Sequence, residues 1–336
     1  MSQVTIKDVA KKANVSITTV SLILNNKAES ISEETIALVR KVCKELHYQR
    51  NYMAFSLKSK VTNSIGLILP NIDNAYYARI STCLDKLLTE KGYTLFTASS
   101  ENDFKKEITL FKQMEARQVD YLIILPSSAS LLKDNRETLE EALHDLQIKY
   151  VILDRQTGFN DHIEILNDDY YGSTLAMEYL VKHGHRRIAC ITGPENVSSS
   201  EERLRGYINT LNKYNIPVDK SLIYVGDYTF EKAREISKDI IKRNDVDAIF
   251  AFNDMSAYAV YDIYTENDKR IGRDISVIGF DDNPFSSLIS PSLTTVKQDV
   301  QEICKEAIEQ LFNEDNDKHV VKILPTLVER KSVSGK

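Results

Sequence analysis

Polar and aromatic side chains stand at seven places in this sequence where a strand is expected to end. They are carboxylates, amides, guanidinium groups and phenols, a set that can bind vicinal sugar hydroxyls in paired hydrogen bonds. Tyrosine rings can also cover the apolar C–H faces of a sugar. A lone Asp after a strand is more often a helix cap, but the joint pattern favours a ligand site. The groups are Asn74, Tyr76 and Tyr77; Asp154 and Arg155; Ser199 to Arg203; Asp227 and Tyr228; Asn253 and Asp254; Asp281 and Asp282; and Lys297 and Gln298.

Seven apolar segments predict buried β-strands, and amphipathic helical segments lie between them. This alternation predicts right-handed βαβ crossovers and parallel sheets, which is an α/β fold. Residues 61–336 are about 275 residues long, which is more than one doubly wound domain usually contains, so we expect two lobes. Ligands of open parallel sheets bind at the carboxyl ends of strands, where these polar groups stand. The strand candidates are 65–70, 94–97, 121–126, 150–154, 187–192, 248–252 and 275–280.

The first sixty residues have a different pattern, that of a small all-α head with a helix-turn-helix. Thr5 can cap a first helix with Asp8 three residues later, and Ser16 can cap a second, with Asn14-Val15 as the turn between them. A third helix is expected from Ser32 to about Leu46. Apolar residues at helical spacing would form the core of this head, namely Ile6, Val9, Ala10, Ala13, Val15, Val20 and Ile23.

In a helix-turn-helix, the second helix enters the DNA major groove and presents its first turns to base edges. Ile17, Thr18 and Leu22 lie on the outward face of that helix. Other polar residues are suited to phosphate oxygens, which fix register rather than sequence, and these are Ser16, Thr19, Ser21 and Asn25. An ordinary pair of surface helices is the alternative that the spacing alone leaves open.

The distribution of charge favours DNA binding. Residues 1–60 hold ten Lys and Arg against five Asp and Glu, a formal +5, whereas the other 276 residues carry −11, giving −6 in total. A basic head on an acidic body suits a protein whose head faces a polyphosphate.

Several other classes of protein are disfavoured. The four cysteines are scattered without a Cys-x-x-Cys pair, which is typical of reduced cytoplasmic thiols rather than of disulfides or zinc ligands. His183-Gly-His185 is expected to be a turn between a helix and a strand, not a metal site. Neither a membrane-spanning run nor a signal peptide is indicated, and no dinucleotide-binding or nucleophile-elbow motif is present. We therefore expect a cytoplasmic protein with no enzymatic activity, metal or cofactor, and no membrane partner.

Residues 5–66 resemble the lactose/galactose repressor family of bacterial transcription regulators. The resemblance is carried by Thr5-Ile-Lys-Asp-Val-Ala, by Val-Ser-x-x-Thr-Val-Ser at 15–21, and by the Asn-x-x-Ala-x-Ser-Leu hinge at 51–57. Three residues depart from the usual pattern: Leu22 and Phe55 each replace an arginine, and Arg50 replaces a proline. Leu22 favours an apolar contact, such as one with a thymine methyl, over paired hydrogen bonds to guanine.

In that family, the hinge becomes helical when two copies pair on DNA, and each copy wedges a leucine into the minor groove. Eight residues are too few to form a stable helix alone in water. The resemblance implies that Leu57 is this wedge, which unstacks a base step and bends the duplex. The expected DNA-binding set is Thr5, Ser16, Ile17, Thr18, Thr19, Ser21, Leu22, Asn25, Asn51, Ala54, Leu57 and Lys58.

The body also resembles bacterial periplasmic ribose-binding proteins, which implies a two-lobed fold whose lobes are joined by three crossing strands, here near 155–165, 286–298 and 321–327. The implied organisation is a head at 1–49, a hinge helix at 50–60, and an effector-binding and dimerisation domain at 61–336. Its first lobe would comprise about 61–158 and 293–323, and its second about 159–292 and 324–336. The sugar-contacting positions of that family fall on Asn74, Tyr76, Tyr77, Asp154, Arg155, Arg203, Tyr228, Asn253, Asp281 and Gln298.

Together these resemblances imply a homodimeric repressor that binds pseudo-palindromic operator DNA and is regulated by a small sugar, ribose or a related pentose or ketose. A global regulator of the same family, controlled by a purine corepressor or a phosphorylated carrier protein, is an alternative. A sugar carrier or an enzyme is the alternative from another class. No leucine heptad follows Arg330, so a dimer is expected rather than a tetramer.

Overall fold

The computed structural model describes residues 4–24, 28–48, 61–159, 161–313 and 319–336. The chain divides into two units, Met1–Thr62 and Asn63–Lys336, which are referred to below as the head and the body. The expected hinge at 50–60 lies outside the described residues.

The head contains α1 (Ile6–Ala13), α2 (Ile17–Leu24) and α3 (Glu33–Glu45). Their starts follow the expected capping. The Asp8 carboxylate accepts hydrogen bonds from the backbone N–H and the hydroxyl of Thr5, at 2.8 and 2.7 Å. The Ser16 hydroxyl accepts from the Thr19 N–H at 3.0 Å, and Asn14 ends α1 in a left-handed conformation, with φ 53°.

Three helices enclose one small apolar core in the head. Its buried members are Val9, Ala10, Ala13, Val20, Ile23, Val39 and Val42, and Ile6 and Val15 pack against them. This confirms the core predicted from the helical spacing. Burying both short helices against α3 supplies the stability that helices of eight residues lack on their own.

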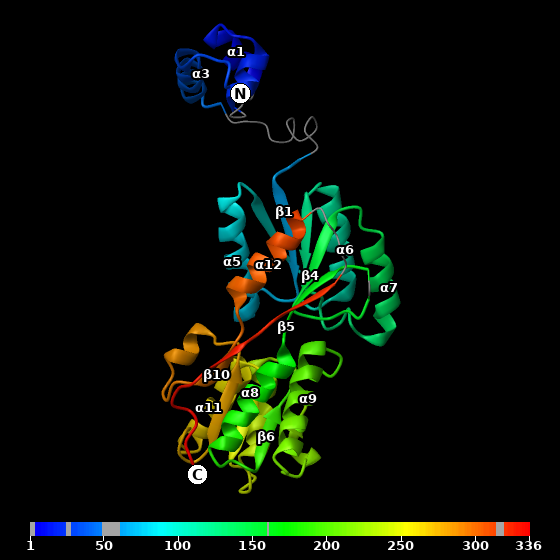
Figure 1. Cartoon of the computed structure of the whole chain (residues 1–336), viewed down its shortest axis with the longest axis vertical. Helices are drawn as coiled ribbons and strands as arrows, with labels where there is room; N and C mark the ends of the chain where they lie inside the picture. The colour runs from blue at the N-terminus through cyan, green and yellow to red at the C-terminus, as the bar shows by residue number, and fades with distance from the viewer. Residues whose placement is uncertain (1–3, 25–27, 49–60, 160, 314–318) are drawn as a thin grey trace. The chain divides into compact units, whose positions relative to one another are not determined.

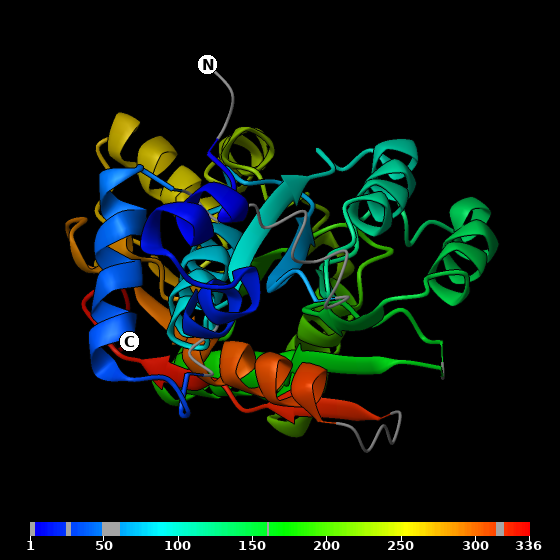
Figure 2. The same ribbon diagram turned by 90° about the horizontal axis from the view of Figure 1, so that it is seen from above.

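The first lobe of the body is built on a six-stranded parallel sheet with the order β11-β5-β4-β3-β1-β2. Its strands are β1 (Ser64–Leu69), β2 (Thr94–Ser99), β3 (Tyr121–Ile124), β4 (Lys149–Leu153), β5 (Ile163–Asn167) and β11 (Val320–Ile323). Helices α5 (Ala75–Glu90) and α12 (Val300–Phe312) pack on one face, and α6 (Phe104–Ala116) and α7 (Lys133–His144) pack on the other (Figures 1 and 2).

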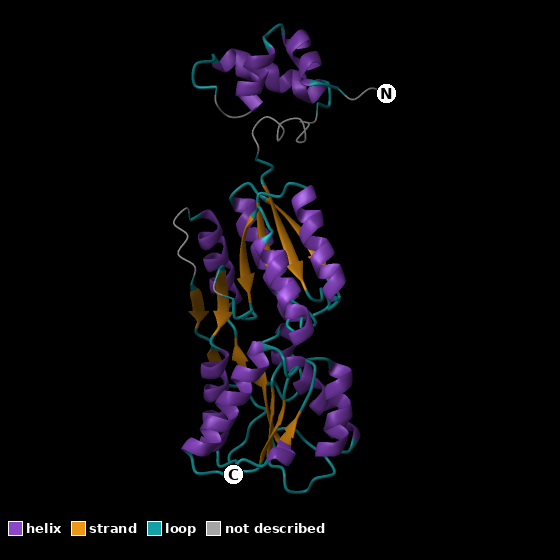
Figure 3. Ribbon diagram, turned by 90° about the vertical axis from the view of Figure 1, so that its right-hand side faces the viewer, coloured by secondary structure: helices purple, strands orange, loops and turns teal. Residues whose placement is uncertain are grey.

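The second lobe repeats this three-layered plan, with helices on both faces of its sheet (Figure 3). The sheet has the order β12-β10-β9-β8-β6-β7, in which only β12 is antiparallel to its neighbour. The strands are β6 (Ile188–Ile191), β7 (Ile223–Tyr224), β8 (Ala248–Ala251), β9 (Ser276–Phe280), β10 (Thr294–Lys297) and β12 (Thr326–Val328). The helices are α8 (Asp169–Lys182), α9 (Ser198–Lys213), α10 (Phe230–Ile240) and α11 (Asp254–Glu266), with short 3₁₀ turns η1 (Lys220–Leu222) and η2 (Pro284–Ser287).

The chain crosses between the two sheets three times: after β5, between β10 and α12, and between β11 and β12. Two of the predicted boundaries need correction. Residues 163–167 pair with β4 in the first sheet, so the first crossing follows Asn167 and the first lobe does not end at 158. Residues 294–297 pair with β9 in the second sheet, so the first lobe resumes near α12 and not at 293.

Polar residues within or beside β5 explain why that strand was missed. Glu164 lies in the middle of β5 yet is buried. Its carboxylate accepts hydrogen bonds from the N–H and the hydroxyl of Thr157, at 2.8 and 2.6 Å. A strand with a buried acid in its middle, held by donors from the preceding turn, does not have the wholly apolar pattern of the other buried strands. No helix in the described residues is long and apolar enough to span a bilayer.

Candidate functional site

One small cavity lies where the two lobes of the body meet, and nine of the ten predicted effector residues line it. Its volume is about 30 Å³, which holds one or two water molecules. The tenth predicted residue, Arg155, lies directly behind the cavity and donates from Nη2 to the Tyr77 hydroxyl at 2.8 Å. The lining residues are Asn74, Tyr76, Tyr77, Asp154, Ser199, Arg203, Tyr228, Asn253, Asp281 and Gln298. Ser199 was flagged as following a strand but was not among the ten.

The first lobe contributes a fixed group of phenols and charges. Arg155 is buried, and its Nη1 donates to the Pro126 carbonyl at 2.8 Å while Nη2 holds Tyr77. The Tyr77 hydroxyl donates in turn to the Asp154 carboxylate at 3.3 Å. Burial raises the pKa of Tyr77 far above its ordinary value, so the phenol stays neutral and can donate. Tyr76, beside it, accepts from the Asn167 amide at 2.9 Å.

The second lobe contributes a buried guanidinium. Arg203 on α9 is only 4% exposed, and its Nε and Nη2 lie 2.8 and 2.7 Å from the same Asp169 carboxylate oxygen. Its Nη1 donates to the Phe252 carbonyl, and its guanidinium carbon lies 3.6 Å from the centroid of the Phe280 ring. Burial raises the pKa of Asp169 to about 7, opposed by Arg203. The guanidinium is therefore held in one orientation at the cavity wall.

Asp281 follows β9 and accepts from the Gln298 amide Nε2 at 2.6 Å. Burial raises the pKa of Asp281 well above its ordinary value, and the charge of Arg203 opposes this rise.

Three lining residues have left-handed backbone, with φ of 72° at Asp154, 70° at Tyr228 and 119° at Asp281. Such conformations cost of order 1–3 kcal/mol each in residues other than glycine and are concentrated at functional sites.

Two lining asparagines act as helix caps. Capping is the role that a single polar residue after a strand most often has, in place of ligand binding. Asn74 Oδ1 accepts from the Tyr76 N–H at 2.9 Å and starts α5. Asn253 Oδ1 accepts from the Ser256 N–H and Nδ2 donates to the Tyr228 carbonyl, both at 2.9 Å. Asn253 thus holds Tyr228, whose ring passes over Gly193 so closely that a Cβ there would lie 2.1 Å from ring Cζ. That glycine is a signal that the sequence reasoning did not use.

Hydrogen bonds join the two lobes around the cavity. Arg79 on α5 donates from Nη1 to the carbonyls of Asp281 and Asp282, at 3.0 and 2.9 Å. Asn196 in the second lobe donates to the Ser128 carbonyl in the first, at 2.6 Å. With its side chains as they stand, the cavity is too small for a sugar or a base, so ligand binding requires movement of the lining side chains.

In the head, two of the three predicted base-reading residues, Ile17 and Thr18, lie at the exposed start of α2, and Leu22 lies near its end. Ile17 is 45% exposed, Thr18 is also exposed, and Leu22 is partly buried. The Ser16 and Thr19 hydroxyls lie 2.8 Å apart, and the Thr5 side chain bonds to Asp8. The predictions for Asn25, Asn51, Ala54, Leu57 and Lys58 lie outside the described residues.

Neither histidine of the 183–185 turn is arranged as a metal ligand. His183 Nδ1 lies 2.8 Å from the Tyr179 carbonyl, and His185 Nε2 lies 3.0 Å from the Ser334 carbonyl. Across the described ranges, no cluster of three or more His, Cys, Asp or Glu could hold a metal ion.

Two family models match the chain. Residues 5–51 match the lacI family of bacterial regulatory proteins, and residues 177–333 match a periplasmic binding protein-like domain. Among curated proteins, the transcriptional repressor PurR of Pectobacterium carotovorum is 32% identical over 98% of this chain and 97% of its own length.

The chain is also similar to solved structures of regulators of this kind. The lac repressor dimer, bound to operator and the anti-inducer ONPF, superposes with a TM-score of 0.87 at 26% identity, covering 99% of this chain and 100% of that one. A regulator from Alkaliphilus metalliredigens, in complex with D-xylulofuranose, has a TM-score of 0.71 at 26% identity, covering 81% of this chain and 99% of its own.

Proposed function

This chain belongs to the lacI family of bacterial regulatory proteins and is a DNA-binding transcriptional repressor, and we propose that a small sugar bound between its lobes sets its affinity for operator DNA. The observation that carries the proposal is the interlobe cavity, in which carboxylates, a guanidinium and phenols converge from both lobes. Ribose or a related pentose or ketose is the proposed ligand class.

The chemistry of the cavity favours a polyhydroxylated ligand. Asp154 and Asp281 offer acceptors on opposite lobes, and Arg203 offers donors in a fixed orientation. One sugar ring presents several hydroxyls, each both donor and acceptor, that can satisfy these groups together. The rings of Tyr76 and Tyr77 are tilted by 52° with centroids 5.6 Å apart, an arrangement that suits the faces of a puckered ring better than a flat stack.

A purine corepressor is the second candidate. The recurrence of repressors named PurR among relatives 31–33% identical to this chain favours it. A purine would use the same carboxylates as acceptors for its ring N–H groups, but it would leave more of the lining donors without partners. Unpaired buried polar groups lower affinity.

The proposed mechanism is a two-state equilibrium of the lobes. A ligand bound by groups of both lobes stabilises the arrangement in which Arg79 reaches the carbonyls beyond β9. In a dimer, two sites can divide the roughly 10⁴-fold differential affinity needed to reverse a 1:99 population, about 100-fold at each site. The resemblance to the family points to residues 50–60 as the segment that transmits this change to DNA.

We propose that two copies associate through apolar residues exposed on both lobes. In the second lobe, Phe285 within η2 is 62% exposed and Leu288 directly after it is 76% exposed. In the first lobe, Ile72 and Phe96 are also exposed. Large apolar side chains exposed to solvent are candidates for an association site, and the lac repressor relative is a dimer.

Calorimetry separates the ligand candidates. We expect heat and a single site per chain with D-ribose, D-fructose or another small sugar, and none with adenine or hypoxanthine. Binding of a purine base alone would replace the sugar proposal with the corepressor. Tight binding of a phosphorylated carrier protein, with no heat from any sugar, would favour the global regulator instead.

A further inference from the structure

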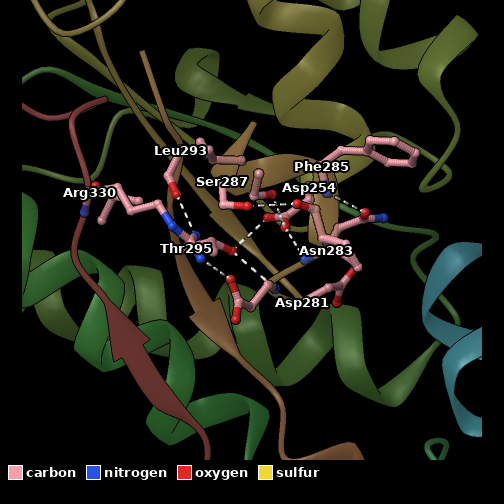
Figure 4. Close-up of polar contacts among 12 residues, drawn as sticks. Asp254, Asp281, Asn283, Phe285, Ser287, Leu293, Thr295 and Arg330 are labelled. Atoms are coloured by element: carbon pink, nitrogen blue, oxygen red, sulfur yellow. Dashed lines mark hydrogen bonds and ion pairs between the residues drawn. The ribbon is translucent and has the colours of Figure 1, made fainter. Parts of the chain in front are cut away.

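A buried carboxylate lies directly behind the second-lobe wall of the cavity. Asp254 is the first residue of α11, next to the lining residue Asn253, and its side chain is fully buried. Oδ2 accepts from the Asn283 N–H at 2.7 Å and from the Ser286 hydroxyl at 2.6 Å. Oδ1 accepts from the Thr295 hydroxyl at 2.6 Å (Figure 4). These three donors and the positive end of a helix stabilise the charge.

The neighbouring strand is shaped to admit this carboxylate. At Gly279 on β9, a Cβ atom would lie 2.2 Å from Asp254 Oδ1. Any larger residue at 279 would displace the carboxylate from its three donors.

Asp254 holds the segment from Asp281 to Ser287. This segment borders the cavity, contacts the first lobe and leads into η2. At its start, the Asp281 carboxylate lines the cavity and accepts from Gln298. Next, the carbonyls of Asp281 and Asp282 accept from Arg79 of the first lobe. The Asp282 carboxylate pairs with Arg330 at 2.6 Å. The segment then enters η2, which carries the exposed Phe285.

The backbone of this segment is held away from its relaxed conformation. Asp281 and Asp282 have φ of 119° and 51°, and residues other than glycine keep such values only where surrounding contacts over-determine them. Asp254 supplies one of those contacts, because it accepts from the backbone N–H of the residue that follows Asp282. Release of that N–H would let both residues relax, turning the Asp281 carboxylate from the cavity and its carbonyl from Arg79.

We propose that Asp254 is a positioning residue of the effector site, whose buried carboxylate fixes the Asp281–Ser287 segment so that Asp281 faces the ligand and the carbonyls of Asp281 and Asp282 face Arg79. The inference rests on the proposed function, since it assumes that the cavity binds the effector. Asp254 touches no ligand in this scheme and acts through Asp281.

Two substitutions test the role of Asp254, with one matched control. Asp254→Asn keeps the volume and the fold, but its neutral amide replaces the charge-assisted hydrogen bond from the Asn283 N–H by a weaker neutral one. Gly279→Ala leaves the carboxylate chemically intact but displaces it. Asp262→Asn, a partly exposed acid on the same helix that pairs with Arg234, is the control.

The readouts are calorimetry with D-ribose and with adenine, hydrogen exchange of the 281–288 segment, and melting temperature. We expect both variants to bind the ligand about tenfold more weakly, as loss of one charge-assisted hydrogen bond predicts. Exchange at Asn283 should be about tenfold faster, and the control should match the wild type. A purely structural role would lower the melting temperature and leave the ligand affinity of the folded protein unchanged, which would overturn the inference.

Failure of the proposed function gives a different pattern. If no small sugar binds the wild type, the ligand proposal fails, whereas exchange still tests the segment. Faster exchange at Asn283 in both variants supports the positioning role. An exchange rate at Asn283 in Asp254→Asn equal to that of the wild type would overturn the positioning role.

Discussion

Replacing Arg203 by methionine isolates the buried charge pair in the wall of the second lobe. Methionine keeps the contact with Phe280 but leaves Asp169 without the two contacts at 2.8 and 2.7 Å. Both partners are buried, and removing one member of a buried pair costs about 3–5 kcal/mol, because an uncompensated charge remains. We expect a loss of that size in the free energy of unfolding at pH 8.5.

The loss should shrink as the pH falls. Burial raises the pKa of Asp169 from 3.8 to about 7 in the presence of Arg203, and removal of the guanidinium raises it further. Below pH 7 the folded forms of both proteins carry a protonated Asp169, so their stabilities change in parallel. Above pH 7 the wild type ionises beside Arg203, whereas the variant must bury an unpaired carboxylate or keep its proton. The gap should therefore be about 2 kcal/mol smaller at pH 6 than at pH 8.5.

Urea unfolding followed by circular dichroism at both pH values measures this gap. Arg234→Met is the matched control, since Arg234 pairs with Asp262 and Glu266 at the surface. Its loss should stay below about 1 kcal/mol and should not widen with pH. In the Arg203→Met protein, a second change, Asp169→Asn, should recover most of the stability. An Arg203→Met loss equal at both pH values, or no larger than the control, would refute the reasoning.

Three further predictions concern ligand, assembly and DNA. Asp281→Asn should weaken sugar binding at least tenfold in calorimetry and leave operator affinity unchanged; a joint loss of both would make Asp281 a structural residue. Leu288→Glu should convert dimers to monomers in sedimentation velocity at micromolar concentration, and an unchanged dimer would remove the exposed Leu288 from the interface. Leu57→Ala should weaken operator binding in fluorescence anisotropy without changing sugar affinity; unaltered operator affinity would contradict the minor-groove wedge.

The local parts of the architecture could be predicted from the sequence. Helix caps at Thr5 and Ser16 depend on residues three positions away, and the structure contains both. The seven apolar segments all form strands, and six of them are largely buried in a parallel sheet, whereas β2 lies at a sheet edge and is partly exposed. The apolar pattern did not predict β5, which carries the buried Glu164 that accepts from Thr157 across a turn.

Long-range contacts could not be predicted. The pair of Asp254 with Thr295 joins residues 41 positions apart, and the bonds from Arg79 to the 281–282 carbonyls span more than 200 positions. No periodicity in the sequence relates such partners. Asn253 both caps α11 and donates to the Tyr228 carbonyl. The second contact could not be predicted either, because it depends on which strands lie side by side.

The most direct test of the account is operator binding with and without ligand. Operator fragments would be selected from genomic DNA by the wild-type protein, and their affinity measured by anisotropy in the presence of D-ribose, other small sugars, adenine and hypoxanthine. We predict that one sugar changes the operator affinity of the wild type by about 100-fold or more and leaves that of Asp281→Asn unaffected. A response to a purine base alone, or an equal sugar response in both proteins, would contradict it.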